Sequence, residues 1–283
     1  MENTKGTEEL RKLNGAIRTL KDNMVDFVPA VSITLGSGLD YMVKLLSNSN
    51  HLRYQKIPYC PLPSATGHQG RLYWGELCGL PVAMLQGRVH CNEEDDVHRV
   101  VFLTRALAKL GCKKFIFTHA VGAVNKNLEP RDIVAIRSHV GFNCPDPTAG
   151  LGIPLLGTEF TPMGEAYSSR LLALAKKCAL KSNVSLHWGV SYFKVGRTYE
   201  TEAEVEMMRR AGADVATMST VPEVIAAVHM GAEVLDLALV TNMGAGLGSA
   251  VPLSHDEVKS VAKQMKKPFG DLIKEIINEM KIL

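Results

Sequence analysis

Hydrophobic positions along the chain alternate between helical spacing and short apolar runs. The first helix is predicted over residues 8–22, where apolar side chains recur every three or four residues. Further helices are predicted over residues 97–110, 166–180, 201–211 and 256–283, and from Pro222 onward. Strands are predicted over residues 30–35, 114–118, 132–137, 188–195, 215–218 and 234–241, with a hairpin over residues 71–86.

Strands and helices alternate from one end of the chain to the other. This order predicts an α/β fold, a three-layer sandwich in which helices flank a mixed and mostly buried β-sheet. The length of 283 residues allows one or two domains at about 150 residues per domain. No linker, composition break or internal repeat divides the sequence. We therefore expect a single domain over residues 1–283, with an N-terminal helix within residues 1–25 and a C-terminal helix within residues 255–283.

Composition and charge exclude several classes of protein. Hydrophobic residues make up 46% of the chain and charged residues 22%, the balance of a globular protein and not of a disordered chain, a collagen or a coiled coil. The net charge of +3 is too small to indicate a nucleic acid or an anionic membrane as the partner. It still allows a small anionic substrate.

The sequence also indicates a compartment. The N-terminus is polar and has no apolar segment before a cleavage site, so we expect no secretory signal. Residues 224–240, the longest apolar stretch, are interrupted by His229, Glu233 and Asp236 and predict no membrane span. The six cysteines form no CxxC pair, so we expect no metal site. Their even number allows three disulfides, but because we expect no secretory signal, free thiols in a cytoplasmic protein are the favoured interpretation.

Several predicted strands end in small residues with one or two polar groups. Ligands of α/β folds bind at the carboxyl ends of strands, where small residues let a ligand approach the backbone. The segments are Gly36-Ser37-Gly38, Thr118-His119-Ala120-Val121-Gly122, Met218-Ser219-Thr220 and Thr241-Asn242-Met243-Gly244. The first of them does not fit a dinucleotide fingerprint, a nucleophile elbow or a P-loop. It is either a tight turn or an anion-binding loop in which Ser37 donates its hydroxyl.

Two further segments and one strand end carry candidate binding groups. Arg88 can donate two hydrogen bonds to a phosphate and His90 a third, although an Arg-x-His pair after a strand is also common on surfaces. Tyr199 can stack on a flat ring whose edge Glu200 binds, or Glu200 can help to cap the next helix. Asn242 can offer a donor and an acceptor to the same ring, or it can bond within its own turn.

Taken in order, these motifs resemble the trimeric purine nucleoside phosphorylases. The resemblance runs from residue 30 to the end of the chain, and the Met-Ser-Thr-Val-Pro-Glu-Val run at residues 218–224 is its most specific part. It rests on Gly36-Ser37-Gly38-Leu39, Gly67-His68, Gln86-Gly87-Arg88-x-His90, Tyr199-Glu200-Thr201, Met218-Ser219-Thr220-Val221-Pro222-Glu223-Val224, Thr241-Asn242 and Ser254-His255.

The resemblance implies phosphorolysis of the N-glycosidic bond of purine (deoxy)ribonucleosides such as inosine and guanosine. Inorganic phosphate is then a co-substrate, and no metal or organic cofactor is needed. The resemblance implies that phosphate is bound by Ser37, His68, Arg88, His90, Ser219 and the backbone N–H of Ala120. It implies that the nucleoside is bound by Tyr199, Glu200, Met218, Asn242 and His255, with catalytic roles for His90, Glu200 and Asn242. It also implies a homotrimer in which Phe160 of the Pro- and Gly-rich loop at residues 143–163 reaches a neighbouring subunit's site.

The sequence departs from the family pattern at the expected site. Asn92 stands where the family has a Tyr that covers the ribose, and the acidic run at residues 93–96 brings negative charge close to the phosphate residues. His119 stands where an Asn is usual, Thr217 where a Gly is usual, and Arg197 where a Pro is usual. Three interpretations stay open. They are an active phosphorylase for 6-oxopurine nucleosides, a phosphorylase with a shifted substrate such as xanthosine or a 5′-modified nucleoside, and a purine-binding homologue with weak turnover.

Overall fold

The computed structural model describes residues 4–64, 69–93, 96–151, 156–248 and 255–282. Its helices are α1 (Thr4–Asn23), α2 (Val97–Val100), α3 (Phe102–Leu110), α4 (Ser169–Lys181), α5 (Glu202–Arg210), α6 (Val221–His229), α7 (His255–Gln264) and α8 (Lys266–Glu279), with short 3-10 turns at Asp40–Leu45, Tyr54–Lys56 and Met280–Ile282. Its strands are β1 (Val31–Leu35), β2 (Ser47–Arg53), β3 (Arg71–Leu77), β4 (Leu80–Gln86), β5 (Lys114–Ala123), β6 (Ile133–Val140), β7 (Leu186–Phe193), β8 (Val215–Thr217) and β9 (Glu233–Met243).

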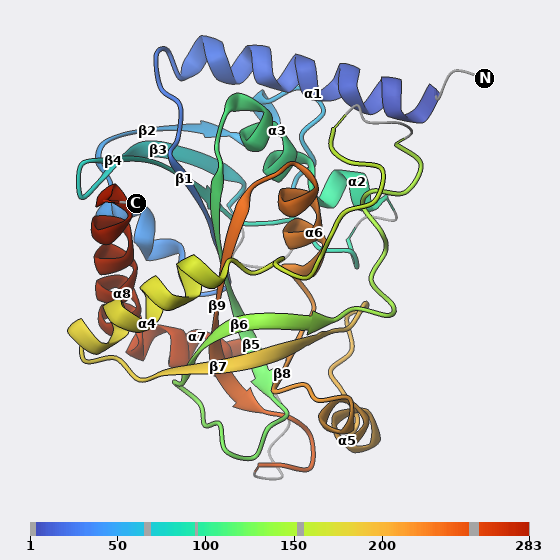
Figure 1. The fold of residues 1–283 in the computed structure, drawn as a ribbon, viewed down its shortest axis with the longest axis vertical. Coiled ribbons are helices and arrows are strands. Elements are labelled where there is room, and N and C mark those ends of the chain that lie inside the picture. Colours follow the sequence, from blue (N-terminus) through green and yellow to red (C-terminus); the bar gives the residue numbers. More distant parts are fainter. Residues whose placement is uncertain (1–3, 65–68, 94–95, 152–155, 249–254, 283) are drawn as a thin grey trace.

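The strands form one mixed sheet, part of which closes on itself (Figure 1). The order β2-β3-β4-β1-β5 is an open sheet, whereas β5, β8, β7, β6 and β9 make a ring because β5 pairs with both β8 and β9. A register shift after Val121 lets the last two residues of β5, Gly122 and Ala123, also pair with β8. Strands β1, β4, β5 and β9 are mutually parallel, so their carboxyl ends meet at one edge of the sheet.

Helices pack on this sheet in two groups. The helix α1 lies across one end of the molecule and packs on α3, which packs on α6, and α6 contacts β9 (Figure 1). The second group consists of α4, α7 and α8, with α4 against β6 and β9 and α7 against β9. Side chains such as Ile33, Phe117 and Leu237, which are almost completely buried, fill the space between these layers. The expected α/β fold, with a mixed sheet flanked by helices, is therefore confirmed.

Two predicted helices are each divided in the structure. The expected helix at residues 97–110 breaks at Val101, and the expected helix at residues 256–283 breaks at Met265. The second break has a clear cause, because Pro268 has no backbone N–H and its ring would clash with the carbonyl of Gln264 in a continuous helix. In the observed structure Pro268 lies in the first turn of α8, where proline is tolerated.

Two strands differ from the prediction. The strand β2 was not predicted, because its sequence SNSNHLR is polar and only Leu52 is buried. It forms an edge strand that pairs with β3 alone, where no apolar pattern is required. The strand β5 continues five residues beyond the predicted end at residue 118, because the small and polar residues after Thr118 pair with β9. No helix among the described residues is both long enough and apolar enough to cross a membrane.

Candidate active site

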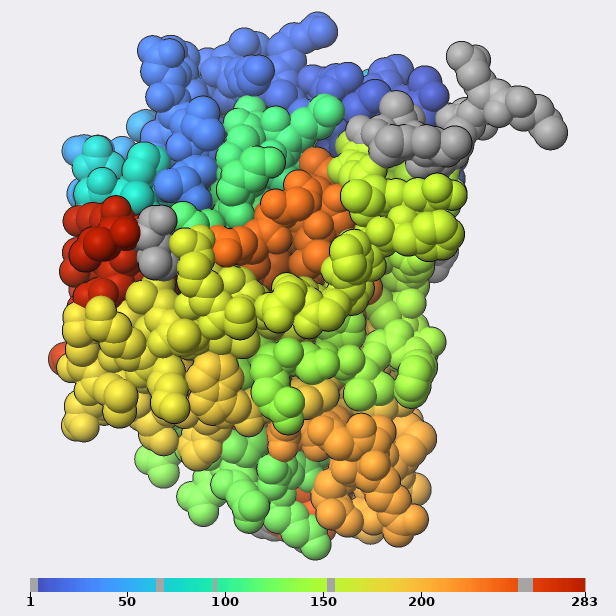
Figure 2. All heavy atoms as spheres, in the orientation of Figure 1, coloured from blue at the N-terminus to red at the C-terminus, as the bar shows by residue number. Residues whose placement is uncertain are grey.

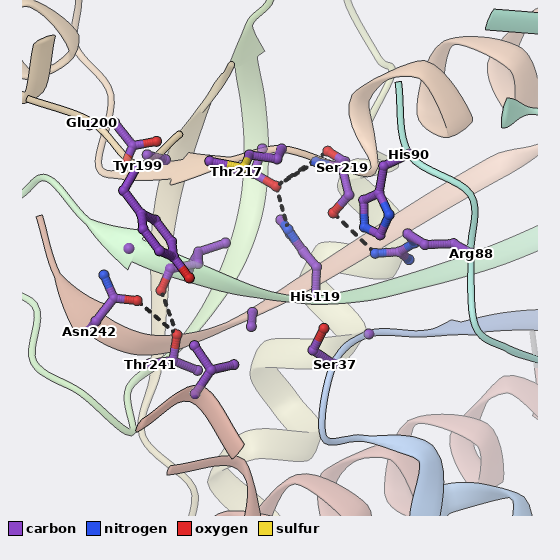
Figure 3. A pocket seen from close by; sticks show the side chains of 17 residues that line it. Ser37, Arg88, His90, His119, Tyr199, Glu200, Thr217, Ser219, Thr241 and Asn242 are labelled. Carbon is purple, nitrogen blue, oxygen red and sulfur yellow. Dashed lines mark hydrogen bonds between the residues drawn. The ribbon is translucent and has the colours of Figure 1, made fainter. Parts of the chain in front are cut away.

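A cavity of about 170 Å³ opens at the edge of the sheet where the parallel strands end (Figure 3). Nine residues singled out from the sequence line it: Ser37, Arg88, His90, Ala120, Tyr199, Glu200, Met218, Ser219 and Asn242. They come from six chain segments far apart in sequence. Arg88, His90 and Ser219 lie on one side in Figure 3, and Tyr199, Glu200 and Asn242 lie on the other.

Three predicted residues are not seen in this cavity. His68 lies outside the described residues. His255 is the first residue of α7, and its side chain also lies outside the described part of the structure. Phe160 is 84% exposed in the loop between β6 and α4. The described parts of that loop run over the face of the molecule shown in Figure 2, and His229 of α6 contacts the Thr158 carbonyl at 3.1 Å.

The segment after β1 approaches β5 so closely that only a glycine fits at position 36. A Cβ at Gly36 would lie 2.6 Å from the His119 Cα, a distance that no side chain tolerates. The Gly36 N–H donates to the Thr118 hydroxyl at 3.2 Å, and that hydroxyl donates to the Thr34 carbonyl at 2.9 Å. These two hydrogen bonds hold the turn so that Ser37 lines the cavity. The turn therefore has the close backbone approach that an anion-binding loop needs.

Arg88 is buried between two polar partners. Its Nε lies 3.1 Å from Oε2 of Glu223, and its Nη1 donates to the Ser219 hydroxyl at 3.2 Å. Burial raises the pKa of the Glu223 carboxyl, and Arg88 opposes that shift. A buried ion pair of this kind holds a guanidinium in one orientation. The Arg88 fork is thus fixed at the cavity wall and is not part of a solvated surface pair.

His90 is oriented by the first residue of the acidic run. Glu93 Oε1 lies 2.6 Å from His90 Nδ1 and accepts the His90 backbone N–H at 3.0 Å. Glu93 Oε2 accepts the Ser64 hydroxyl at 2.6 Å and also the Ser64 backbone N–H. Burial acts to raise the pKa of Glu93, but the hydrogen bonds from His90 and Ser64 outweigh it and lower the pKa to about 2. Glu93 is therefore a carboxylate that binds His90 and does not face the cavity.

Of the other three residues of the acidic run at residues 93–96, the structure describes the side chain of one. Asp96 is the N-cap of α2, and its side chain accepts the His98 backbone N–H at 3.1 Å. Glu94 and Asp95 lie outside the described residues. Two of the four acidic side chains thus have local partners and do not oppose an anion in the cavity.

The chain makes a strained turn beside Arg88. Thr220 has φ +65° and ψ −47°, and the Val221 N–H donates to the Ser219 carbonyl at 2.8 Å. This is a γ-turn of the rare type with positive φ. Backbone strain of this kind persists where the surroundings hold it, and it is concentrated at functional sites. The turn aims the Ser219 hydroxyl at Arg88.

Tyr199 and Glu200 follow β7 on the opposite side of the cavity. Tyr199 is 45% exposed, which leaves its ring available to a ligand. Burial raises the pKa of the Glu200 carboxyl. The cap of α5 is made by Thr201 and Glu204, which form a reciprocal capping box. Glu200 is therefore not the capping residue of α5, and its carboxyl is left at the cavity.

The amide of Asn242 is held in one orientation at the end of β9. Its Oδ1 accepts the Thr241 hydroxyl at 3.0 Å, and its Nδ2 donates to the Met243 carbonyl at 3.2 Å. An amide nitrogen carries two hydrogens, so Asn242 keeps a donor for a ligand.

Asn92 connects the two sides of the site. Its Nδ2 donates to the Gly196 carbonyl at 3.1 Å, three residues before Tyr199. The residue that replaces the aromatic ribose cover of the resembled family thus binds the segment that carries Tyr199 and Glu200. The contact spans 104 positions of sequence, and no local pattern predicts it.

Several cavity residues were not predicted as ligands. His119 and Thr217 lie between the two sides in Figure 3, and Thr241, Ala216 and Val258 are also among the residues that line the cavity. In the sequence, His119 and Thr217 are departures from the pattern of the resembled family. Thr241 could be predicted as a cavity residue because it precedes Asn242 at the end of a buried strand. Nothing in the sequence around Val258 of α7 predicts that it lines the cavity.

Comparisons with known proteins agree with this geometry. A family model described as the phosphorylase superfamily matches residues 31–278. The chain is 38% identical to purine nucleoside phosphorylase 1 of Geobacillus stearothermophilus, over 89% of this chain and 92% of that protein. It is 36% identical to purine nucleoside phosphorylase 1 of Bacillus subtilis, over 94% and 97%. A crystal structure of Schistosoma mansoni purine nucleoside phosphorylase in complex with inosine is 30% identical, with a TM-score of 0.89 over 95% of this chain and 96% of that chain.

Proposed function

Because the chain belongs to the phosphorylase superfamily, and within it to the purine nucleoside phosphorylases, we propose that it cleaves the N-glycosidic bond of purine ribonucleosides and deoxyribonucleosides with inorganic phosphate. The products are the free base and (deoxy)ribose 1-phosphate. Inosine and guanosine are the proposed substrates. The observation that carries the proposal is one cavity with fixed phosphate donors on one side and groups for a purine ring on the other.

The phosphate side consists of Ser37, Arg88, His90, Ser219 and the Ala120 backbone. The Arg88 guanidinium, held by Glu223, and the two hydroxyls present donors to one anion. His68, which precedes β3 in the sequence, is proposed to lie close to this site. An anion held in this way can place one oxygen against the C1′ atom of the nucleoside.

The nucleoside side consists of Tyr199, Met218, Glu200 and Asn242. Tyr199 and Met218 pack on the base and ribose, and Glu200 accepts a hydrogen bond from the purine edge. Asn242 donates to the ring nitrogen nearest the sugar. His255 is proposed to bind the ribose 5′-hydroxyl.

The reaction follows from this placement. A phosphate oxygen forms a bond to C1′ as the bond from C1′ to the purine nitrogen breaks, and the electron pair of that bond moves onto the purine. The ribosyl group is cationic in the transition state, between an anionic phosphate and a purine that gains negative charge. Donors fixed in advance at both ends stabilise this arrangement, the largest type of catalytic contribution in many enzymes. We propose no metal or organic cofactor, because positioned donors supply the required stabilisation.

We also propose a homotrimer in the cytoplasm. Phe160 is a large apolar side chain that is 84% exposed, and a neighbouring subunit's nucleoside site is a chemically suitable place for its ring. The six cysteines are free thiols, which suits a reducing compartment.

The test is release of hypoxanthine from inosine, measured with and without inorganic phosphate. We expect turnover that requires phosphate and yields ribose 1-phosphate in equal amount to the base. The control is Glu200→Ala, which removes the proposed contact to the purine edge. The proposal is wrong if the wild-type protein has no more activity than this control.

A shifted substrate is a second candidate, which the side chain of Asn92 favours. Asn92 donates to the Gly196 carbonyl and stands at the sequence position where the resembled family has a Tyr that covers the ribose. A panel of inosine, guanosine, xanthosine and a 5′-modified nucleoside distinguishes the two candidates by their kcat/KM values. Calorimetric binding of nucleosides without turnover would instead identify the weak purine-binding homologue.

A further inference from the structure

A buried carboxylate lies behind the phosphate side of the cavity. Asp236 is in the middle of β9 and is 0% exposed. Within the described part of the chain its one ion-pair partner is His119 of β5, whose Nε2 lies 3.1 Å from Asp236 Oδ1. A buried carboxylate is costly unless it is paired, so the contact with His119 holds the imidazole ring beside Asp236. Nε2 faces Asp236, and Nδ1 faces the other way.

The other ring nitrogen binds Thr217. His119 Nδ1 lies 2.9 Å from the Thr217 hydroxyl oxygen, and both residues are almost completely buried. The Thr217 hydroxyl has one hydrogen, so when it donates to a backbone carbonyl it accepts a hydrogen bond from His119 Nδ1. His119 and Thr217 are two positions at which the sequence departs from the pattern of the family it resembles. The structure therefore joins two separate departures in one hydrogen bond.

Thr217 in turn holds the backbone of Ser219. The Thr217 hydroxyl oxygen accepts the Ser219 N–H at 3.2 Å, and it donates to the Ser219 carbonyl at 3.3 Å. That carbonyl also closes the γ-turn at Thr220, and the Ser219 hydroxyl contacts Arg88. A strained turn needs surroundings that over-determine it. The contacts from Asp236 through His119 and Thr217 end on this turn.

We propose that Asp236, His119 and Thr217 are positioning residues that hold Ser219 against Arg88 and thereby set the affinity of the site for phosphate. This inference rests on the proposed function, since it assigns phosphate to the side of the cavity where Arg88 and Ser219 lie. None of the three side chains needs to contact the phosphate in order to change its affinity. Their contribution passes through the Ser219 backbone.

The decisive variant is Thr217→Val, which removes the hydroxyl with little change in shape. Kd for inorganic phosphate, measured by calorimetry, and KM for phosphate are both expected to rise about tenfold. KM for inosine is expected to stay within about twofold, because Tyr199, Glu200 and Asn242 are untouched. Thr217→Ser, which keeps the hydroxyl, is expected to restore most of the phosphate affinity. Thr19→Val in α1 is the matched control, because α1 contributes no residue to the cavity lining and the Thr19 hydroxyl donates to the Gly15 carbonyl of its own helix.

The inference is overturned if Thr217→Val leaves the phosphate Kd unchanged, or if it raises both KM values equally. Thermal unfolding of each variant shows whether a loss of affinity reflects a loss of fold. Asp236→Asn with His119→Asn gives a second test, in which the same split between the two KM values is expected. Failure of the proposed function is a separate outcome. In that case wild-type protein releases no base from nucleosides, and the phosphate titrations of wild type and Thr217→Val still test the positioning.

Discussion

Glu93 Oε1 lies 2.6 Å from Nδ1 of His90, so the first residue of the acidic run orients a donor of the proposed phosphate site. The contact fixes the orientation of the His90 ring, because Nδ1 lies against the Glu93 carboxylate. The acidic run is compatible with an anion in the cavity, because its first carboxylate binds a residue of the site and does not face the anion.

Replacing Glu93 by Gln tests this contact through the dependence of stability on pH. The pKa of Glu93 is lowered from 4.5 to about 2 in the folded protein, so the carboxylate stabilises the fold above pH 4.5 and this contribution is lost as the pH falls toward 2. Glu93→Gln is therefore expected to lower the free energy of unfolding by about 1–3 kcal/mol at pH 7 and by less at pH 3. Urea denaturation at both pH values measures it. An equal difference at the two pH values would contradict the assignment.

Replacing Arg88 by Lys separates charge from geometry. Lysine keeps the positive charge but cannot contact Glu223 and Ser219 with a planar fork. We expect KM for phosphate to rise about tenfold or more, because one donor and the orientation of the others are lost. Stability is expected to fall as well, since Glu223 then lies buried beside a poorer partner. Initial rates at varied phosphate and urea denaturation measure the two effects. Unchanged KM for phosphate would remove Arg88 from the proposed site.

Replacing Glu200 by Gln is expected to lower activity without lowering stability. Burial raises the pKa of Glu200, so its charged form is disfavoured in the folded state and destabilises the fold as the pH rises through that pKa. The neutral amide avoids this cost. Glu200→Gln is thus expected to have an unfolding temperature at pH 7 equal to or above that of the wild type, while kcat/KM for inosine falls at least about tenfold. The stability difference between the two proteins should decrease at pH 4. A variant that loses stability and activity together would indicate a structural role.

Part of the site could be predicted from the sequence because it lies at strand ends. Small residues after an apolar run, as in Gly36-Ser37-Gly38, mark the place where a chain leaves a sheet, and parallel strands bring such places together. The partner of Asp236 could not be predicted in this way. An apolar run predicts a buried strand even with one polar residue in it, but the partner of that residue depends on which strand lies beside it. The pairing of β9 with β5 brings Asp236 to His119, and this pairing is a property of the closed part of the sheet.

Long-range side-chain contacts were also beyond prediction. In the sequence Asn92 stands out only because it lacks an aromatic ring, and its contact with Gly196 depends on how two loops meet. The strand β2 illustrates the same limit for the fold, since an exposed edge strand needs backbone pairing but no hydrophobic pattern.

Replacing Asn92 by Ala should affect the nucleoside and not the phosphate. The change leaves the Gly196 carbonyl without this donor and loosens the segment that carries Tyr199 and Glu200. We expect KM for inosine to rise about threefold to tenfold, with KM for phosphate within about twofold. This split is the reverse of the one expected for Thr217→Val, so the pair of variants tests the division of the cavity into two sides. The same split for both variants would refute that division.

Phe160 provides the test of the proposed trimer. Its side chain is 84% exposed in the isolated subunit, so Phe160→Ala removes almost no packing within that subunit. If the ring completes a neighbouring nucleoside site, the variant should keep its size in solution and its KM for phosphate, while KM for inosine rises about tenfold.

Mixed assemblies of two variants test directly whether Phe160 acts between subunits. Subunits with Phe160→Ala and subunits with Glu200→Ala each form defective sites alone, but a refolded mixture contains sites with an intact Glu200 and a Phe160 supplied by the other type. Activity of the mixture above the sum of the two separate variants is the expected result. Activity equal to that sum would show that Phe160 does not act between subunits.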